Sequence, residues 1–255
     1  IEVSKSVIAA QMYTVREFTK TPKDIAASLA QLRSIGYEAV QLSALGPIET
    51  EELAKMLQGE GLTAAATHIS WERLRNAPEA VIEEHRILGC KHVALGSMPG
   101  EYRNDEGVVR FAKEASEVAL RLAEAGLTFS YHNHSFEFER FGRRTLMQAL
   151  MEESDPSLGM EIDTYWVQHG GGDPAAWIRK AKGRIPIVHL KDMTMKGREQ
   201  LMAEVGEGNL NWPAILEACR DAGVEWYCVE QDICQRDPFE SLAISLRNLR
   251  EMGLH

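Results

Sequence analysis

The feature that most constrains the fold is an eight-fold alternation of short apolar segments with longer amphipathic ones. The apolar segments span residues 7–15, 38–44, 62–70, 91–97, 127–133, 159–166, 185–192 and 225–232. Each has the length of a buried strand, and the stretch that follows it has the apolar period of a helix. Helices are expected to open at Thr21-Pro22, Thr145, Asp173-Pro174, Asn211 and Asp237-Pro238.

Eight strand–helix units in 255 residues have the size of a (β/α)8 TIM barrel. An open doubly wound sheet usually stops at about five or six strands, and no GxGxxG follows the first apolar segment to mark a dinucleotide-binding domain. No linker, composition shift or low-complexity tract divides the chain. The sequence therefore predicts an α/β fold, with one barrel domain over residues 1–255.

Charge and composition narrow the function classes. The chain has 28 basic and 38 acidic residues and a net charge of −10, which argues against a nucleic-acid partner, because phosphate binding needs clustered Lys and Arg. No apolar run is long enough to span a bilayer, so no membrane partner is expected. The four cysteines lack CxxC spacing and are expected to be buried free thiols in a reducing compartment, which makes the cytoplasm the expected location.

Polar side chains gather at the carboxyl ends of four successive strand segments. Period-two alternation puts His132, Asp163, His189 and Glu230 on inward faces. Barrel enzymes place their chemistry at this end, so these side chains are expected to share one cavity. Alone, each is an ordinary hydrogen-bonded histidine or solvated acid. Together they predict a divalent metal site, and imidazole with carboxylate suits Mn²⁺, Fe²⁺, Co²⁺ or Zn²⁺ better than Ca²⁺.

Further residues are expected around this cavity. Tyr165 is placed on the same inward face as Asp163, and Lys191 on that of His189. The Lys191 ammonium could stabilise a developing enolate oxygen, or it could form an ion pair with Asp163 or Asp232. His68, at the end of the third segment, could bind substrate hydroxyls or serve the structure. Trp166 offers an apolar surface to a sugar ring.

Several segments resemble the sugar phosphate isomerase/epimerase superfamily of xylose isomerase-like TIM barrels. They are YHNHSFEF, EIDTYW, IVHLKDM, VGEGNLNW and VEQD, and the resemblance runs over nearly the whole chain. It implies one divalent metal, held by Glu, Asp, His and Glu from the fifth to eighth strands, the last three matching Asp163, His189 and Glu230. Manganese is the expected metal, with Mg, Co, Fe or Zn as alternatives. The resemblance also implies a carbohydrate substrate and allows a homo-oligomer or a second, different subunit.

The first ligand departs from the family pattern. Ketose epimerases of the family have approximately ENH at the end of the fifth strand, whereas this chain has His132-Asn133-His134. Either His132 binds the metal, or Glu137 folds back to bind it and His132 is a general base. We prefer the second interpretation. The expected metal ligands are then Glu137, Asp163, His189 and Glu230; the catalytic residues His132, Glu230 and Lys191; and the substrate-binding residues His68, His134 and Trp166.

The predicted reaction is proton abstraction next to a carbonyl through an enediolate, in an isomerase, epimerase or lyase acting on a sugar, keto-sugar or cyclitol. Because one of the paired glutamates is missing, the motif is more similar to dehydratases of keto-inositols or enzymes that eliminate from 3-keto-glycosides than to a symmetric epimerase. Two alternatives stay open. They are a metal-dependent phosphodiesterase of the endonuclease IV-like branch, and a metal-free barrel that binds sugars or serves as a subunit.

Overall fold

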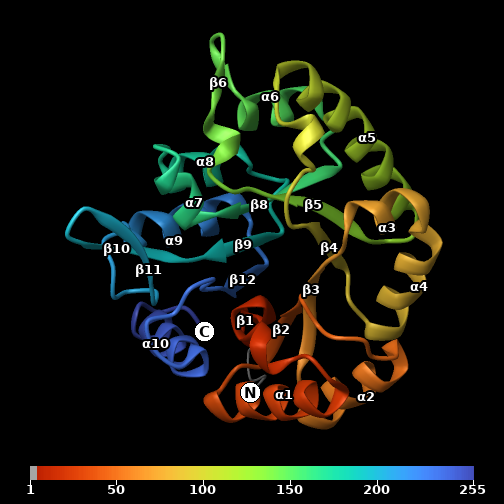
Figure 1. Cartoon of the computed structure of the whole chain (residues 1–255), viewed down its shortest axis with the longest axis vertical. Helices are drawn as coiled ribbons and strands as arrows, with labels where there is room; N and C mark the ends of the chain where they lie inside the picture. The colour runs from red at the N-terminus through yellow and green to blue at the C-terminus, as the bar shows by residue number, and fades with distance from the viewer. Residues whose placement is uncertain (1–4) are drawn as a thin grey trace.

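Eight parallel strands close into a barrel in the computed structural model, which describes residues 5–255. The strands are β1 (Ile8–Gln11), β2 (Ala39–Leu42), β3 (Thr63–His68), β4 (His92–Leu95), β5 (Thr128–His132), β8 (Leu158–Asp163), β9 (Ile187–Leu190) and β12 (Trp226–Val229). Their order around the barrel is β1-β12-β9-β8-β5-β4-β3-β2. The predicted TIM barrel is confirmed, and Figure 1 shows its helices arranged outside the strands.

The helices follow the strands along the chain. They are α1 (Pro22–Ile35), α2 (Thr50–Glu60), α3 (Trp71–Asn76), α4 (Pro78–Leu88), α5 (Asp105–Glu124), α6 (Leu146–Glu153), α7 (Thr164–His169), α8 (Pro174–Lys180), α9 (Trp212–Ala222) and α10 (Pro238–Glu251). Short 3-10 helices are η1 (Met12–Phe18), η2 (Gly100–Tyr102) and η3 (Phe136–Phe138). Within the described residues, no helix is long and apolar enough to cross a membrane.

The predicted helix starts are confirmed by side chains that accept hydrogen bonds from the first turn. Thr21 accepts from the backbone N–H of Asp24 at 3.2 Å, which closes the start of α1. Thr145, Asp173, Asn211 and Asp237 cap α6, α8, α9 and α10 in the same way. Each cap accepts a hydrogen bond from an N–H group that has no partner within the helix. The position of the cap therefore determines where the helix begins.

Two packed layers hold the barrel together. Small residues and one branched residue fill the lumen; they are Ala9, Ala39, Ala65, Ala66, Ile187 and Cys228. The outward faces of the strands pack against the helices in a much larger apolar cluster. Because small side chains fill this part of the lumen, the larger polar groups predicted from the sequence lie toward the mouth.

Several strands are shorter than the apolar segments suggested. The segment 159–166 forms a strand only to Asp163, because the Asp163 carboxylate accepts a hydrogen bond from the Trp166 N–H and starts helix α7. The expectation that Tyr165 continues the inward face of the strand was therefore wrong. The segment 7–15 likewise ends as a strand at Gln11, whose side chain accepts from Tyr13 and starts η1.

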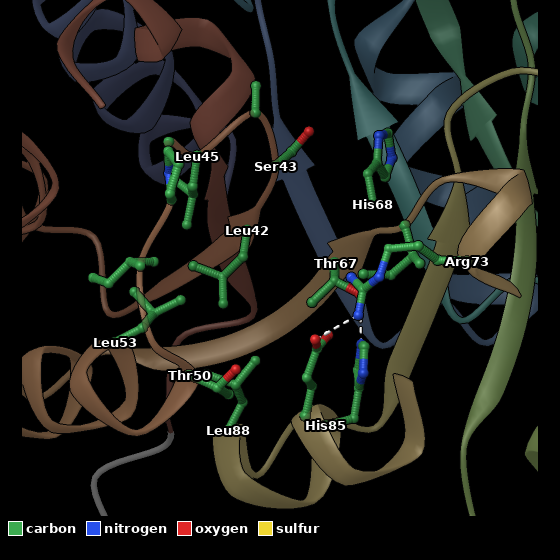
Figure 2. Close-up of a pocket in the computed structure, with 16 residues that line it drawn as sticks. Leu42, Ser43, Leu45, Thr50, Leu53, Thr67, His68, Arg73, His85 and Leu88 are labelled. Carbon is green, nitrogen blue, oxygen red and sulfur yellow. Dashed lines mark hydrogen bonds and ion pairs between the residues drawn. The ribbon is translucent and has the colours of Figure 1, made fainter. Parts of the chain in front are cut away.

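Two hairpins extend from the barrel. The long connection after β5 contains η3 and a small hairpin of β6 (Arg140–Phe141) and β7 (Arg144–Thr145). A longer hairpin of β10 (Asp192–Lys196) and β11 (Glu199–Ala203) follows β9 and projects beside α9 and α10 in Figure 1. A pocket also lies between the ends of β2 and β3 and the helices α2 and α4 (Figure 2).

Candidate metal site at the barrel mouth

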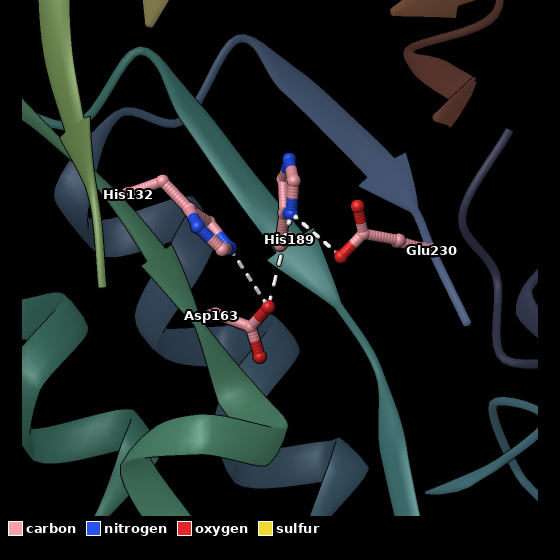
Figure 3. A group of neighbouring side chains, drawn as sticks. All are labelled: His132, Asp163, His189 and Glu230. Atoms are coloured by element: carbon pink, nitrogen blue, oxygen red, sulfur yellow. Dashed lines mark hydrogen bonds and ion pairs between the residues drawn. The ribbon is translucent and has the colours of Figure 1, made fainter. Parts of the chain in front are cut away.

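Four side chains meet at the carboxyl ends of neighbouring strands. His132 ends β5, Asp163 ends β8, His189 lies on β9 and Glu230 directly follows β12. Each offers one ligand atom, and these atoms all lie within 4.8 Å of one another (Figure 3). The parallel register places Asp163 beside His189 and His189 beside Cys228, two residues before Glu230. The predicted convergence of these four residues is what the barrel geometry produces.

The orientation of His189 is fixed from below the site. Its Nε2 lies 2.8 Å from Oε1 of Glu161 and 2.7 Å from Oε1 of Gln41, so this nitrogen carries the proton and donates it. Gln41 in turn donates to the other oxygen of Glu161 at 2.9 Å. The His189 Nδ1 faces Glu230 and Asp163, at 3.5 and 3.8 Å. This buried nitrogen has no hydrogen-bond partner among the described residues. Burial lowers the pKa of His189, but Glu161 and Glu230 outweigh it and hold the pKa well above its ordinary value.

His132 is held between two acceptors. Its Nδ1 lies 2.9 Å from the backbone oxygen of Gly96, and its Nε2 lies 3.0 Å from Oδ2 of Asp163. Burial lowers the pKa of His132, but the hydrogen bond to Asp163 and the nearby carboxylates outweigh it and raise the pKa above its ordinary value. With Nδ1–H donated to Gly96, the Nε2 is the nitrogen available to a cation.

Glu161 and Gln41 were missed as site residues in the sequence. Period-two alternation from Asp163 puts Glu161 on the same inward face, but nothing local indicates a partner for it. The structure shows its Oε1 accepting from His68 at 2.6 Å as well as from His189. Burial alone would raise the pKa of Glu161, yet the two histidines hold it well below the usual range, so the carboxylate is ionised.

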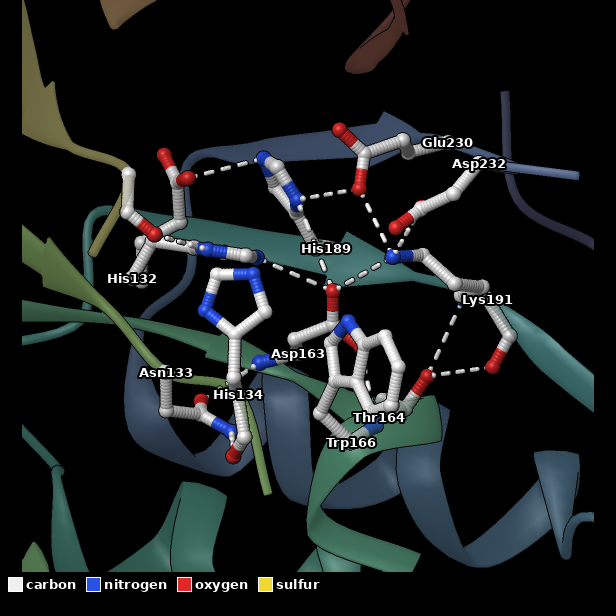
Figure 4. A network of polar contacts seen from close by, with 12 residues as sticks. His132, Asn133, His134, Asp163, Thr164, Trp166, His189, Lys191, Glu230 and Asp232 are labelled. Carbon is white, nitrogen blue, oxygen red and sulfur yellow. Dashed lines mark hydrogen bonds and ion pairs between the residues drawn. The ribbon is translucent and has the colours of Figure 1, made fainter. Parts of the chain in front are cut away.

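Lys191 joins three carboxylates in a buried network (Figure 4). Its Nζ lies 3.0 Å from Asp163, 2.7 Å from Glu230 and 2.6 Å from Asp232. Burial opposes the charge, but these carboxylates hold the pKa of Lys191 well above its ordinary value. Lys191 is fully buried. Of the two roles considered from the sequence, the structure therefore places it in the ion pair with Asp163 and Asp232.

The pKa values of the carboxylates around Lys191 shift in different directions. Burial raises the pKa of Asp163 and Glu230, yet Lys191 and the histidines outweigh it and hold both well below the usual range. Asp232 is partly exposed at the cavity edge, and burial together with the charge of Glu230 raises its pKa. The two ligand candidates are therefore ionised at neutral pH.

Glu137 lies elsewhere, which corrects the expectation that it completes the metal set. The turn η3 directs its carboxylate back to the outside of β5, where it accepts from the Tyr131 hydroxyl at 2.7 Å and from the His134 N–H at 2.9 Å. The side chain is fully buried, and burial raises its pKa. Glu137 thus supports the turn that follows β5, while His132 occupies the position next to Asp163.

His134 and Trp166 stand over the site from one side. Their ring centroids are 5.6 Å apart, and His134 packs edge-on against His132 at 5.0 Å. Burial lowers the pKa of His134 to about 3, so the ring is neutral near physiological pH. The His134 Nδ1 and the Trp166 Nε1 are buried without a hydrogen-bond partner among the described residues. Both are available to a molecule bound above His132.

A cavity of about 380 Å³ opens above these residues. It is lined by Tyr13, Ser43, Ala44, His68, Gly96, Ser97, His132, His134, Glu230 and Asp232. Its volume is in the range of small-molecule sites. His68, His132 and His134 border it, whereas Asp163, His189 and Lys191 lie beneath.

The residues present fit a divalent cation. Two nitrogens and two carboxylates converge, and Nδ1 of His189, which is buried without a hydrogen-bond partner among the described residues, faces the carboxylates. Second contacts to Gly96 and Glu161 fix which nitrogen of each histidine faces the centre, as in metal sites generally. Asp163, Glu230 and Asp232 share the single ammonium of Lys191, and Glu161 adds a fourth carboxylate beside His189, so the site attracts positive charge.

Comparisons with known proteins agree with this architecture. Residues 29–252 match the family model for the xylose isomerase-like TIM barrel. The rhizopine catabolism protein MocC of Rhizobium meliloti is 25% identical over 264 residues, which cover 88% of this chain and 80% of that protein.

Solved structures give a similar result. A sugar phosphate isomerase/epimerase from Parabacteroides distasonis superposes with a TM-score of 0.81 at 22% identity, covering 98% of this chain and 96% of that one. The probable 3-DHS dehydratase AsbF from Bacillus anthracis superposes with a TM-score of 0.73 at 12% identity, covering 96% and 99%. At these identities, the likeness shows the shared fold.

Proposed function

This chain belongs to the xylose isomerase-like TIM barrel family, and we propose that it is a divalent-metal-dependent enzyme acting on a sugar, keto-sugar or cyclitol. The proposed reaction is removal of a proton next to a carbonyl through an enediolate, with isomerisation, epimerisation or elimination as the outcome. The observation that carries the proposal is the convergence of His132, Asp163, His189 and Glu230 beneath a cavity of sugar size.

The proposed metal ligands are His132 Nε2, His189 Nδ1 and one oxygen each of Asp163 and Glu230, with manganese as the first candidate. When bound, a divalent cation polarises the carbonyl oxygen of the substrate and so acidifies the neighbouring C–H group. His132 takes the position of the first family ligand, in place of the Glu137 that we expected from the sequence.

The protein side chains are proposed to accept the proton, hold the acids in place and bind the substrate. Glu230 borders the cavity and is ionised, so its free oxygen is the proposed acceptor of the substrate proton. Lys191 touches no part of the cavity lining except the two acids, so it is a positioning residue that keeps Glu230 and Asp232 in place. His134, Trp166 and His68 are proposed to bind the substrate. His134 Nδ1 and Trp166 Nε1 have no hydrogen-bond partner among the described residues, Trp166 offers an apolar ring face, and His68 borders the cavity.

The neighbours support both possible outcomes. One similar structure is a sugar phosphate isomerase/epimerase and another a probable dehydratase, and a relative serves rhizopine catabolism. Removal of an α-proton is shared by isomerases and dehydratases, so the site supports the step more firmly than the product. A soluble carbohydrate is the proposed partner.

The decisive experiment combines metal analysis with solvent exchange. Wild-type protein is expected to retain a divalent metal after dialysis and to incorporate deuterium from D₂O into at least one member of a panel of ketoses, inososes and 3-keto-glycosides. Asp163→Asn is expected to lose both properties. Asp173→Asn is the matched control, because asparagine also caps a helix start and residue 173 lies outside the site. A wild type that holds no metal and exchanges no proton would refute the proposal.

A further inference from the structure

A second pocket adjoins the mouth cavity on the outer side of the barrel wall (Figure 2). It has a volume of about 320 Å³ and lies between the ends of β2 and β3 and the helices α2 and α4. Its large apolar lining residues are all aliphatic: Leu42, Leu45, Ile48, Leu53, Ile69 and Leu88. No step of the proposed reaction uses it.

The two cavities share a border. Ser43, Ala44 and His68 line both of them, and His68 is the residue whose Nε2 is fixed by Glu161 at the metal site. A ligand held over His132 therefore meets the second pocket as soon as it extends past the His68 ring. The pocket is placed to receive a part of the same molecule that the mouth cavity binds.

This border is rigid. Ala44 has a φ of 57°, in the left-handed region that alanine rarely adopts. Its carbonyl oxygen accepts a hydrogen bond from the Thr19 hydroxyl at 3.2 Å, and the Gly46 N–H donates to the Thr19 oxygen at 2.8 Å. A Cβ at Gly46 would lie 2.0 Å from the Lys20 oxygen, so only glycine fits there. The loop is thus held in place before any ligand arrives, which lowers the entropic cost of binding.

The charged and imidazole groups of the pocket already have partners. Thr67 Oγ1 lies 2.6 Å from Nε2 of His85, and Nδ1 of His85 lies 2.7 Å from the backbone oxygen of Val81. At the rim, Arg73 and Glu84 form an ion pair. Because the charged and imidazole groups pair with protein groups, an occupant gains little from ion pairing. The aliphatic side chains offer it apolar surface to bury, beside the hydroxyls of Ser43 and Thr50.

We propose that this pocket binds an apolar aglycone, an aryl ring or short alkyl chain attached to the sugar that is processed at the mouth. An engineered cavity of about 150 Å³ lined by aliphatic and aromatic residues is known to bind benzene, so 320 Å³ accommodates one ring. The inference rests on the proposed function only for the sugar part of the ligand. Binding of the aglycone in the pocket can be measured without turnover.

Methyl-labelled NMR tests the proposal directly, since Ile48 and Ile69 are isoleucines of the pocket. The probes are the phenyl and methyl β-glycosides of glucose, galactose and xylose, and phenol alone. We expect the phenyl glycoside of at least one sugar to shift the Ile48 and Ile69 methyl signals and to bind about tenfold or more tightly than its methyl counterpart. Phenol alone should bind more weakly than the phenyl glycoside.

Two variants test whether the tighter binding of the phenyl glycoside arises in this pocket. Ile48→Trp fills the pocket and should remove the advantage of the phenyl glycoside while sparing the affinity for the methyl glycoside. Leu120→Trp is the control, since Leu120 is an exposed leucine of α5. Equal affinity for both glycosides, unmoved pocket methyls, or phenol binding as tightly as the phenyl glycoside would each overturn the inference. Metal content and proton exchange, measured on sugars without an aglycone, report on the proposed function separately.

Discussion

Glu161 Oε1 lies 2.8 Å from Nε2 of His189, on the side of the ring that faces away from Glu230. This carboxylate holds a proton on Nε2 of His189, so it acts on the candidate metal position without touching it. Partners of this kind orient the ligand and raise its basicity, and losing one typically costs about 10- to 100-fold in metal affinity.

We therefore predict that Glu161→Gln lowers Mn²⁺ affinity by about 10- to 100-fold while the barrel stays folded. Titration of the metal-free protein by isothermal calorimetry measures the affinity, and circular dichroism checks the fold. Glu225→Gln is the matched control, because Glu225 pairs with His92 at 3.0 Å but lies at the start of β12, away from the mouth. Equal affinity in wild type and Glu161→Gln would show that His189 needs no such partner.

Substitution can separate the two candidates for the first ligand, His132 at the end of β5 and Glu137 in η3. His132→Ala removes a nitrogen from the ligand group and is expected to lose retained metal, whereas Glu137→Gln is expected to keep it, since the Glu137 carboxylate contacts only Tyr131 and the turn. Metal analysis after dialysis gives the answer. Metal loss in Glu137→Gln with retention in His132→Ala would reverse the assignment.

The barrel and the convergence of three candidate ligands could be predicted because their signals are local. Apolar alternation fixes the strands, and Asp163, His189 and Glu230 stand at strand ends whose convergence follows from parallel closure. Glu137 could not be placed, because its direction depends on how the turn η3 packs against Tyr131, a contact that no pattern in the sequence indicates.

Tertiary contacts also determine the roles of Lys191 and Glu161. Alternation put both side chains inside the barrel, as observed, but it carries no information on which partners reach them. Glu161 finds its partners on β2, β3 and β9, and Lys191 finds carboxylates from β8 and from the segment after β12. Such contacts are set by the register between strands that are distant in sequence.

Removal of the buried Lys191 ammonium is expected to lower the free energy of unfolding. Lys191→Met leaves Asp163, Glu230 and Asp232 without their shared counter-ion, and breaking a buried ion network typically costs about 3–5 kcal/mol. We expect that order of loss in the free energy of unfolding, measured in urea on metal-free protein. Adding Asp232→Asn to Lys191→Met should restore part of it, because one repelling charge is removed. Lys113→Met, at an exposed position of α5, is the control.

A pH-dependent loss of stability is expected at His85, which is not one of the candidate metal ligands. Burial lowers the pKa of His85 below its ordinary 6.5, and the hydrogen bond to Val81 only partly opposes this. The unfolded chain thus binds a proton at a higher pH than the folded chain does. The contribution of neutral His85 to stability is complete above pH 6.5 and decreases as the pH falls from there toward the folded-state pKa.

Urea unfolding of metal-free protein at about pH 7.5 and about pH 5.5 measures this contribution. Wild type should lose more stability on acidification than His85→Gln, since glutamine keeps a polar contact to Thr67 but does not titrate. His169→Gln, which replaces an exposed histidine, should show the same acid-induced loss as wild type. If His85→Gln loses as much stability as wild type between the two pH values, the protonation of His85 is not linked to unfolding, and other buried groups must account for the acid sensitivity.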